Sequence, residues 1–98
     1  MEKLERNFQA GLIKKLKTKF PGCIVLKTDP NYIQGFPDLL ILYHDKWASL
    51  ECKKNAKAKK QPNQDVFVSR MNDMSFSRFI YPENEEVVLN ELQQTLQS

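Results

Sequence analysis

The sequence predicts a single α+β (α/β) domain over residues 1–98, in which a small mixed sheet is flanked by helices in the order αβββαβα. Apolar residues recur every three or four positions near both ends of the chain, which indicates amphipathic helices. Between them lie short apolar runs rich in β-branched and aromatic residues, which are typical of strands. Proline and glycine separate these segments, and 98 residues suffice for one domain only.

A first helix is expected over residues 2–20, ended by the Pro-Gly pair that follows it. Its apolar side consists of six residues with helical spacing: Leu4, Phe8, Leu12, Ile13, Leu16 and Phe20. Residues 23–27 are β-branched and apolar, so we expect them to form a buried strand. Residues 28–35 contain an Asp-Pro-Asn sequence and a glycine, which predicts a loop.

The middle of the chain predicts a β-hairpin. Its strands are expected over residues 38–43 and 47–53, with a turn at 44–46. Pairing of these strands places the start of the first beside the end of the second.

The second half of the chain supplies the remaining elements. Residues 55–61 are polar and rich in lysine, which indicates a connection. A helix is expected over residues 62–73, with Pro62 in its first turn. Residues 76–81 predict a fourth strand and residues 83–97 a last helix, which is acidic at its start. The apolar residues expected to face inward from these two helices are Val66, Phe67, Met71, Val87, Val88, Leu92 and Leu96.

Composition limits the functional class. The net charge is only +3, but lysines gather on the first helix and after the hairpin, whereas acids gather in the C-terminal third. This asymmetry predicts a polyanionic partner that meets one face. No apolar run approaches the roughly 20 residues of a membrane span, so we expect no membrane association. Cys23 and Cys52 lie in apolar runs without a C-x-x-C pattern, which predicts buried free thiols in a reducing cytoplasm.

The hairpin carries the candidate site. Glu51 and Lys53 share one face of its second strand, because side chains alternate along a strand, while Leu50 and Cys52 take the other face. Asp38, which opens the first strand, would then lie next to Glu51 and Lys53. Two carboxylates beside a lysine at the edge of a buried sheet predict a site for a divalent cation and for phosphoryl chemistry.

These residues also carry a family resemblance. Gly35-Phe36-Pro37-Asp38 followed by Glu51-Cys52-Lys53 resembles the PD-(D/E)xK nuclease superfamily. The short αβββαβα order is similar to its stand-alone VRR-NUC branch and to small Holliday-junction resolvases, often encoded by phages. The resemblance covers nearly the whole chain and implies a restriction-endonuclease-like fold. It implies a metal-site glutamate on the first helix, for which Glu5 is the best match and Glu2 is possible. It also implies a glutamine at the start of the helix after the E-x-K strand, here Gln64.

Such a site implies a Mg²⁺ ion, for which Mn²⁺ can substitute, held by hard oxygen ligands. The expected ligands are the carboxylates of Asp38, Glu51 and Glu5 and the backbone carbonyl of Cys52. Lys53 could orient or deprotonate the attacking water, or stabilise charge on the phosphate. Gln64 could hold the water or brace Lys53.

The function implied is a metal-dependent endonuclease acting on branched DNA such as four-way junctions, in the cytoplasm of a bacterium or a phage-infected cell. The expected nucleic-acid contacts are Lys54, Lys57, Lys59, Lys60 and Gln34. Lysines in a mobile segment contact phosphate rather than base edges, so we expect recognition of shape rather than sequence. The alternatives are a less specific DNA nickase of the same fold, a module that binds nucleic acid while a partner does the chemistry, and a structural subunit in which the motif is incidental.

A homodimer is expected, because resolving a four-way junction takes two symmetric cuts and each chain holds one site. The residues considered for its interface are Ile33, Phe36, Phe76 and Phe79.

Overall fold

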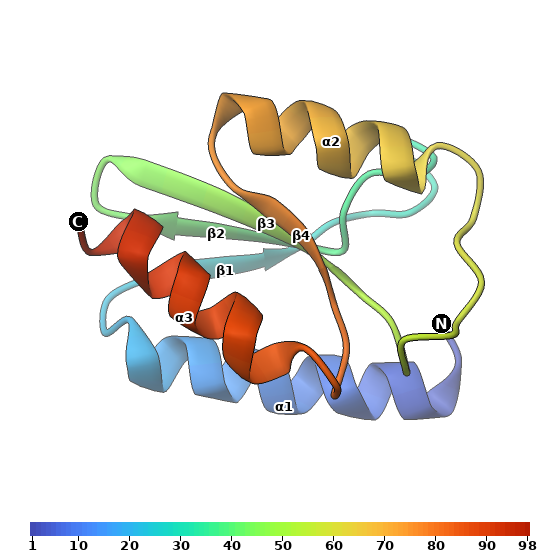
Figure 1. Ribbon diagram of the computed structural model, residues 1–98, viewed down its shortest axis with the longest axis horizontal. Helices are drawn as coiled ribbons and strands as arrows, with labels where there is room; N and C mark the ends of the chain where they lie inside the picture. Colours follow the sequence, from blue (N-terminus) through green and yellow to red (C-terminus); the bar gives the residue numbers. More distant parts are fainter.

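The computed structural model of the protein describes all 98 residues, which form a four-stranded mixed sheet and three helices in an α+β fold. The elements are α1 (Lys3–Lys19), β1 (Ile24–Lys27), β2 (Leu39–Tyr43), β3 (Lys46–Cys52), α2 (Gln64–Met74), β4 (Ser77–Ile80) and α3 (Glu85–Leu96). Their order is the predicted αβββαβα. Helix α2 lies on one face of the sheet, and α1 and α3 lie on the other (Figure 1). None of the helices combines the length and the apolar character needed to cross a membrane.

The strands follow the sheet in sequence order, β1-β2-β3-β4. The first three are antiparallel, and β4 returns through α2 to lie parallel to β3. The hairpin turns over two residues, His44 and Asp45, because His44 adopts a left-handed conformation with φ of 56° that suits such a tight turn. The third residue of the predicted turn, Lys46, belongs to β3 and pairs with Tyr43. This register aligns Leu39 with Leu50. It therefore brings Asp38, the residue before β2, beside the last residues of β3.

The hydrophobic core lies between the sheet and the α1/α3 layer. Its buried members are Leu12, Leu16, Phe20, Leu39, Ile41, Ala48, Leu50, Cys52, Phe76, Ile80, Val88, Leu92 and Leu96. Phe20 meets Tyr43 edge to face with ring centroids 5.6 Å apart, which closes the end of the core farthest from the predicted site. The core therefore holds the apolar face of β3 in place.

Three residues predicted to face inward are exposed: Leu4, Val66 and Val87. Leu4 lies in the first turn of α1, before the stretch that contains the buried residues of this helix. Val66 is in the first turn of α2, whose buried residue is Met71. Val87 precedes Val88, and the buried side of α3 follows the four-residue spacing from Val88.

The prediction that β1 is buried is wrong, because three of its four residues are exposed and Val25 is only half-buried. Strand β1 is at the edge of the sheet, and Ile24 and Leu26 are 56% and 45% exposed. They share a face with Leu40 and Leu42 of β2, with which they are paired. Helix α2 packs chiefly on β3 and β4, so it does not cover this face of β1.

The residues considered for a dimer interface do not form one surface. Phe76 belongs to the core. Phe36 packs against Phe67 of α2, and Phe79 lies under the Lys60 ammonium group at 4.3 Å. Only Ile33 is exposed.

Several boundaries differ slightly from the prediction. Cys23 lies outside β1 and is half-buried, whereas Cys52 is fully buried; both are free thiols, as predicted. Pro62 lies in the turn before α2 rather than in its first helical turn, because Asn63 adopts a left-handed conformation and ends the turn. Helix α2 then begins at Gln64.

Candidate functional site

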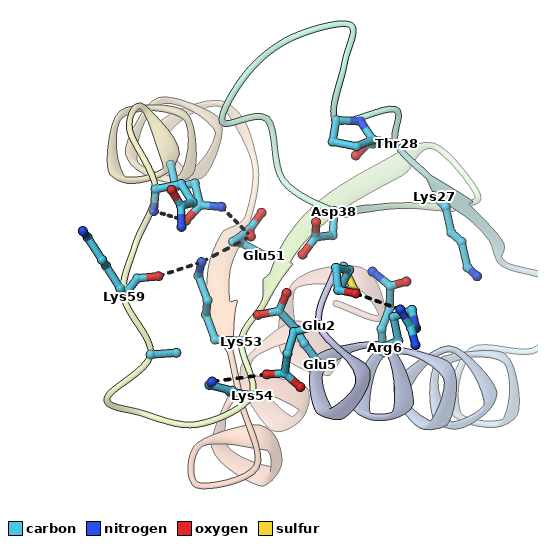
Figure 2. A pocket seen from close by; sticks show the side chains of 16 residues that line it. Glu2, Glu5, Arg6, Lys27, Thr28, Asp38, Glu51, Lys53, Lys54 and Lys59 are labelled. Carbon is cyan, nitrogen blue, oxygen red and sulfur yellow. Dashed lines mark hydrogen bonds and ion pairs between the residues drawn. The ribbon is translucent and has the colours of Figure 1, made fainter.

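The largest cavity of the molecule, about 670 Å³, opens at one end of the sheet (Figure 2). It lies between the start of α1, the ends of β1 and β3, the residue before β2 and the loop after β3. Charged and polar side chains dominate its lining, which is Met1, Glu2, Glu5, Arg6, Gln9, Lys27, Thr28, Pro30, Asp38, Glu51, Lys53, Lys54, Ala58, Lys59, Gln61 and Gln64. The predicted catalytic residues all lie in this cavity.

Asp38 is fixed by the backbone of both neighbouring strands. Its Oδ2 accepts a hydrogen bond from the Cys52 N–H at 2.9 Å, and its carbonyl accepts one from the Thr28 N–H at 2.9 Å. Burial raises the pKa of the Asp38 carboxyl above its ordinary value, while the Cys52 N–H and the nearby Lys53 favour the charged form. The predicted proximity of Asp38 to Glu51 and Lys53 is therefore confirmed.

Glu51 is buried on the polar face of β3, with 2% of its surface exposed. Its Oε2 accepts a hydrogen bond from Gln64 Nε2 at 2.9 Å and lies 4.0 Å from Lys53 Nζ. Its Oε1 is the one buried side-chain polar atom in the protein without a hydrogen-bond partner. Burial, and then the negative charge of Asp38, raise the pKa of Glu51 to about 9. In the absence of a cation, Glu51 therefore holds a proton at neutral pH.

Lys53 directly follows β3 rather than belonging to it as predicted; it is also buried, with 6% of its surface exposed, and lines the same cavity as Glu51. Its Nζ donates a hydrogen bond to the backbone carbonyl of Lys59 at 3.2 Å. The loop after β3 therefore folds back over the site and holds the ammonium group beside the carboxylates (Figure 2).

Gln64 braces Glu51 rather than Lys53. Its Nε2 donates to Glu51, and its Oε1 accepts from the Gln61 N–H at 2.8 Å. The start of α2 is brought to the site by Gly35, where an added Cβ would lie 2.7 Å from the Cβ of Asn63. Gly35 also has φ of 87°, so both its backbone conformation and this close approach require glycine. Glycine at position 35 thus places Gln64 against Glu51.

The glutamates of α1 have different surroundings. Glu5 is partly buried; burial raises its pKa, Lys53 opposes this shift and Asp38 adds to it. Glu2 is exposed, caps the Leu4 N–H and pairs with Lys54 at 3.2 Å. Glu5 is therefore the α1 glutamate that experiences the charges of the site.

A closed metal cage is not formed. No group of three or more His, Cys, Asp or Glu side chains is placed to hold a metal ion. Asp38 and Glu51 form a pair, and Glu5 lines the same cavity from another element. Cys52 takes part through its N–H, which binds Asp38, while its buried thiol faces α1 and has a pKa raised by burial.

The predicted nucleic-acid contacts divide into two sets. Lys54 and Lys59 line the cavity, whereas Lys57, Lys60 and Gln34 do not. Lys60 lies over the Phe79 ring and pairs with Asp65 at 3.2 Å. Sequence reasoning missed Arg6 and Lys27, although each stands beside a predicted feature: Arg6 follows Glu5, and Lys27 ends a strand.

In comparisons with known proteins, the chain matches no family model, no curated protein and no solved structure.

Proposed function

We propose that this protein is a metal-dependent endonuclease that hydrolyses phosphodiester bonds in DNA. The observation that carries the proposal is the buried pair of carboxyl groups of Asp38 and Glu51, in which Glu51 Oε1 has no hydrogen-bond partner unless the pair shares a proton. Buried polar atoms without partners are rare in folded proteins. A buried carboxylate pair requires either a shared proton or a cation, and a cation would also give Oε1 a partner.

The donor set fits a hard divalent ion of the Mg²⁺ type, for which Mn²⁺ can substitute. Asp38 and Glu51 would hold it, with Glu5 and the Cys52 carbonyl as further oxygen donors. When bound, such an ion neutralises charge on the phosphate oxygens and makes a bound water more acidic. We therefore place hydrolysis at the Asp38–Glu51 pair.

The neighbouring side chains have separate roles in this proposal. Lys53 offers an ammonium group that can stabilise negative charge on the phosphate or orient the attacking water. Gln64 keeps Glu51 Oε2 occupied, so that Oε1 remains the free acceptor. Lys54 and Lys59 meet the phosphate backbone next to the reaction site.

We assign the protein to the PD-(D/E)xK superfamily and its VRR-NUC-like branch as part of the same proposal. The αβββαβα order, and the meeting of Asp38 with Glu51 and Lys53 at one end of the sheet, support this assignment. The preference for branched DNA rests on analogy with that branch. So does a homodimer, for which the uncovered apolar side chains Ile24 and Leu26 offer a surface.

Cleavage assays with Mg²⁺ and Mn²⁺ test the proposal on a four-way junction, a fork, linear duplex and single strand. The wild type should nick the junction at paired symmetric positions. Asp38→Ala and Glu51→Ala should each lower the rate by at least roughly 10²–10³-fold, the scale of losing one strong transition-state contact. Glu86→Gln, which removes an exposed acid outside the cavity, should leave the rate unchanged.

Other outcomes would change the conclusion. Equal cleavage of all four substrates would keep the nuclease and remove the junction preference. Binding of DNA without cleavage or metal response would favour the nucleic-acid-binding module. Near wild-type cleavage by a folded Glu51→Ala protein would refute the site.

A further inference from the structure

The cavity has a second basic wall that the sequence did not predict. Arg6 of α1 and Lys27 of β1 both line it. Figure 2 shows them on one side of the carboxylates, with Lys53, Lys54 and Lys59 on the other. The acidic centre, formed by Asp38 and Glu51, is thus flanked by positively charged side chains on both sides.

The cations of this wall are not neutralised by the protein. Neither Arg6 nor Lys27 lies within 4.0 Å of a carboxylate oxygen, in contrast to Lys54, which pairs with Glu2 at 3.2 Å. The only side-chain hydrogen bond of Arg6 goes to the carbonyl of Met1 at 2.9 Å. Both cations therefore keep most of their donors for an anion that enters the cavity.

The wall is also tied to the acidic centre through the sheet. Lys27 pairs with Leu39, the residue after Asp38, and the next N–H, that of Thr28, binds the Asp38 carbonyl. The Thr28 hydroxyl donates to the Pro37 carbonyl at 2.7 Å. The Lys27 backbone is thus held in fixed relation to Asp38, as expected for a binding residue on a rigid element.

We propose that Arg6 and Lys27 bind the DNA backbone on the side of the scissile phosphate opposite to Lys59. This inference rests on the proposed function and deepens it. A strand carries one negative charge per nucleotide, so a strand that crosses the carboxylate pair presents a phosphate to each wall. The substrate class is therefore a nucleic-acid strand that continues in both directions, and the cut is made inside it.

Binding measurements test the wall separately from catalysis. They use a fluorescent DNA duplex with Mg²⁺ in a Glu51→Gln background, which suppresses turnover under the proposed function. Arg6→Gln/Lys27→Gln is compared with Lys14→Gln/Lys17→Gln, which removes the same charge from exposed positions of α1 outside the cavity. Removing one phosphate-binding cation lowers the salt slope of binding by about 1. We expect a drop of about 2 for the first pair and a much smaller change for the second.

Closed circular DNA, which has no free ends, tests whether the bound strand continues on both sides of the cut. The protein with an intact Glu51 should nick a covalently closed circle, and Arg6→Gln/Lys27→Gln should do so more slowly than the control pair.

Each alternative outcome overturns a defined part of the account. If the wild type cleaves DNA but the two double variants behave alike, Arg6 and Lys27 do not bind the DNA backbone, while the proposed nuclease function is kept. If the wild type degrades only DNA with free ends, internal cutting is wrong. If it neither binds nor cleaves DNA, the proposed function and this inference fail together.

Discussion

The two faces of β3 near its end are equally buried and chemically opposite. Leu50 and Cys52, at 0% exposure, point into the core below α1 and α3. Glu51 and Lys53, at 2% and 6%, point toward α2 and the cavity. On the first face each side chain is satisfied by packing, whereas on the second a carboxylate oxygen has no partner. Burial alone therefore does not distinguish core from site; the unmet hydrogen bond does.

The two faces of β3 also contribute to folding stability with opposite sign. Burying an apolar side chain such as Leu50 stabilises a fold by about 1.5–3 kcal/mol. Burying a carboxylate beside another carboxylate opposes folding, because both lose hydration and repel each other. The apolar face of β3 thus stabilises the strand that presents the strained polar face.

The largest effect on stability is expected on the apolar face. Leu50→Ala should lower the free energy of unfolding by about 2–5 kcal/mol, because it opens a cavity in a fully packed core. Urea denaturation at pH 7 measures this change. A loss below 1 kcal/mol, well outside the range for such sites, would mean that the core is not packed as described.

The neighbouring substitution should act in the opposite direction. Glu51→Gln keeps the shape of the side chain and removes the need to hold a proton or a charge in a buried position. In metal-free buffer at pH 8, we expect it to raise the free energy of unfolding by about 1–3 kcal/mol, the scale of an unsatisfied buried polar group. Glu86→Gln serves as the exposed control. Destabilisation by Glu51→Gln without metal would show that the site lacks the strain proposed here.

The pH dependence follows from the same carboxyl. Glu51 has a pKa of about 9 in the folded protein against an ordinary 4.5, so the folded state binds a proton more tightly than the unfolded state. Its contribution to stability is fully present below pH 4.5 and is lost as the pH rises toward 9. Metal-free wild type should therefore lose stability over this window, measured by thermal unfolding, and Glu51→Gln should lose less. Parallel curves for the two proteins would contradict the assignment.

A smaller effect is expected at Gln64, which touches the site through Glu51 Oε2. Residues that orient a metal ligand typically change metal affinity by about 10–100-fold when removed. Gln64→Ala should weaken Mn²⁺ binding by about tenfold, measured by calorimetry, with Gln94→Ala on the exposed side of α3 as control. Equal affinities for the two variants would remove Gln64 from the site.

The sequence predicted the element order and the meeting of Asp38, Glu51 and Lys53, because strand alternation and a short hairpin fix which residues lie side by side. It could not predict that β1 would lie half uncovered. That outcome depends on α2 packing chiefly on β3 and β4, a long-range arrangement that residues 23–27 do not encode.

Some contacts within the cavity also depend on long-range packing and could not be predicted from the sequence. The partner of Gln64 was predicted as Lys53 or water and is Glu51, because the Gly35–Asn63 approach sets where α2 begins. Arg6 and Lys27 were missed, since their role depends on which elements meet at the end of the sheet rather than on a local pattern. Lys60 was included by its place in a lysine run; it lies outside the cavity, pairs with Asp65 and lies over the Phe79 ring.

The most direct test of the account is calorimetric titration of the metal-free protein with Mn²⁺ and Mg²⁺ at pH 7, repeated in buffers of different ionisation enthalpy. Wild type and Glu86→Gln should bind the ion and release protons, because Glu51 must give up its proton to become a ligand. Glu51→Gln should bind far more weakly and release none from this site. Equal binding by wild type and Glu51→Gln, without proton release from either, would contradict the claim that the Glu51 carboxylate is a ligand of a divalent cation.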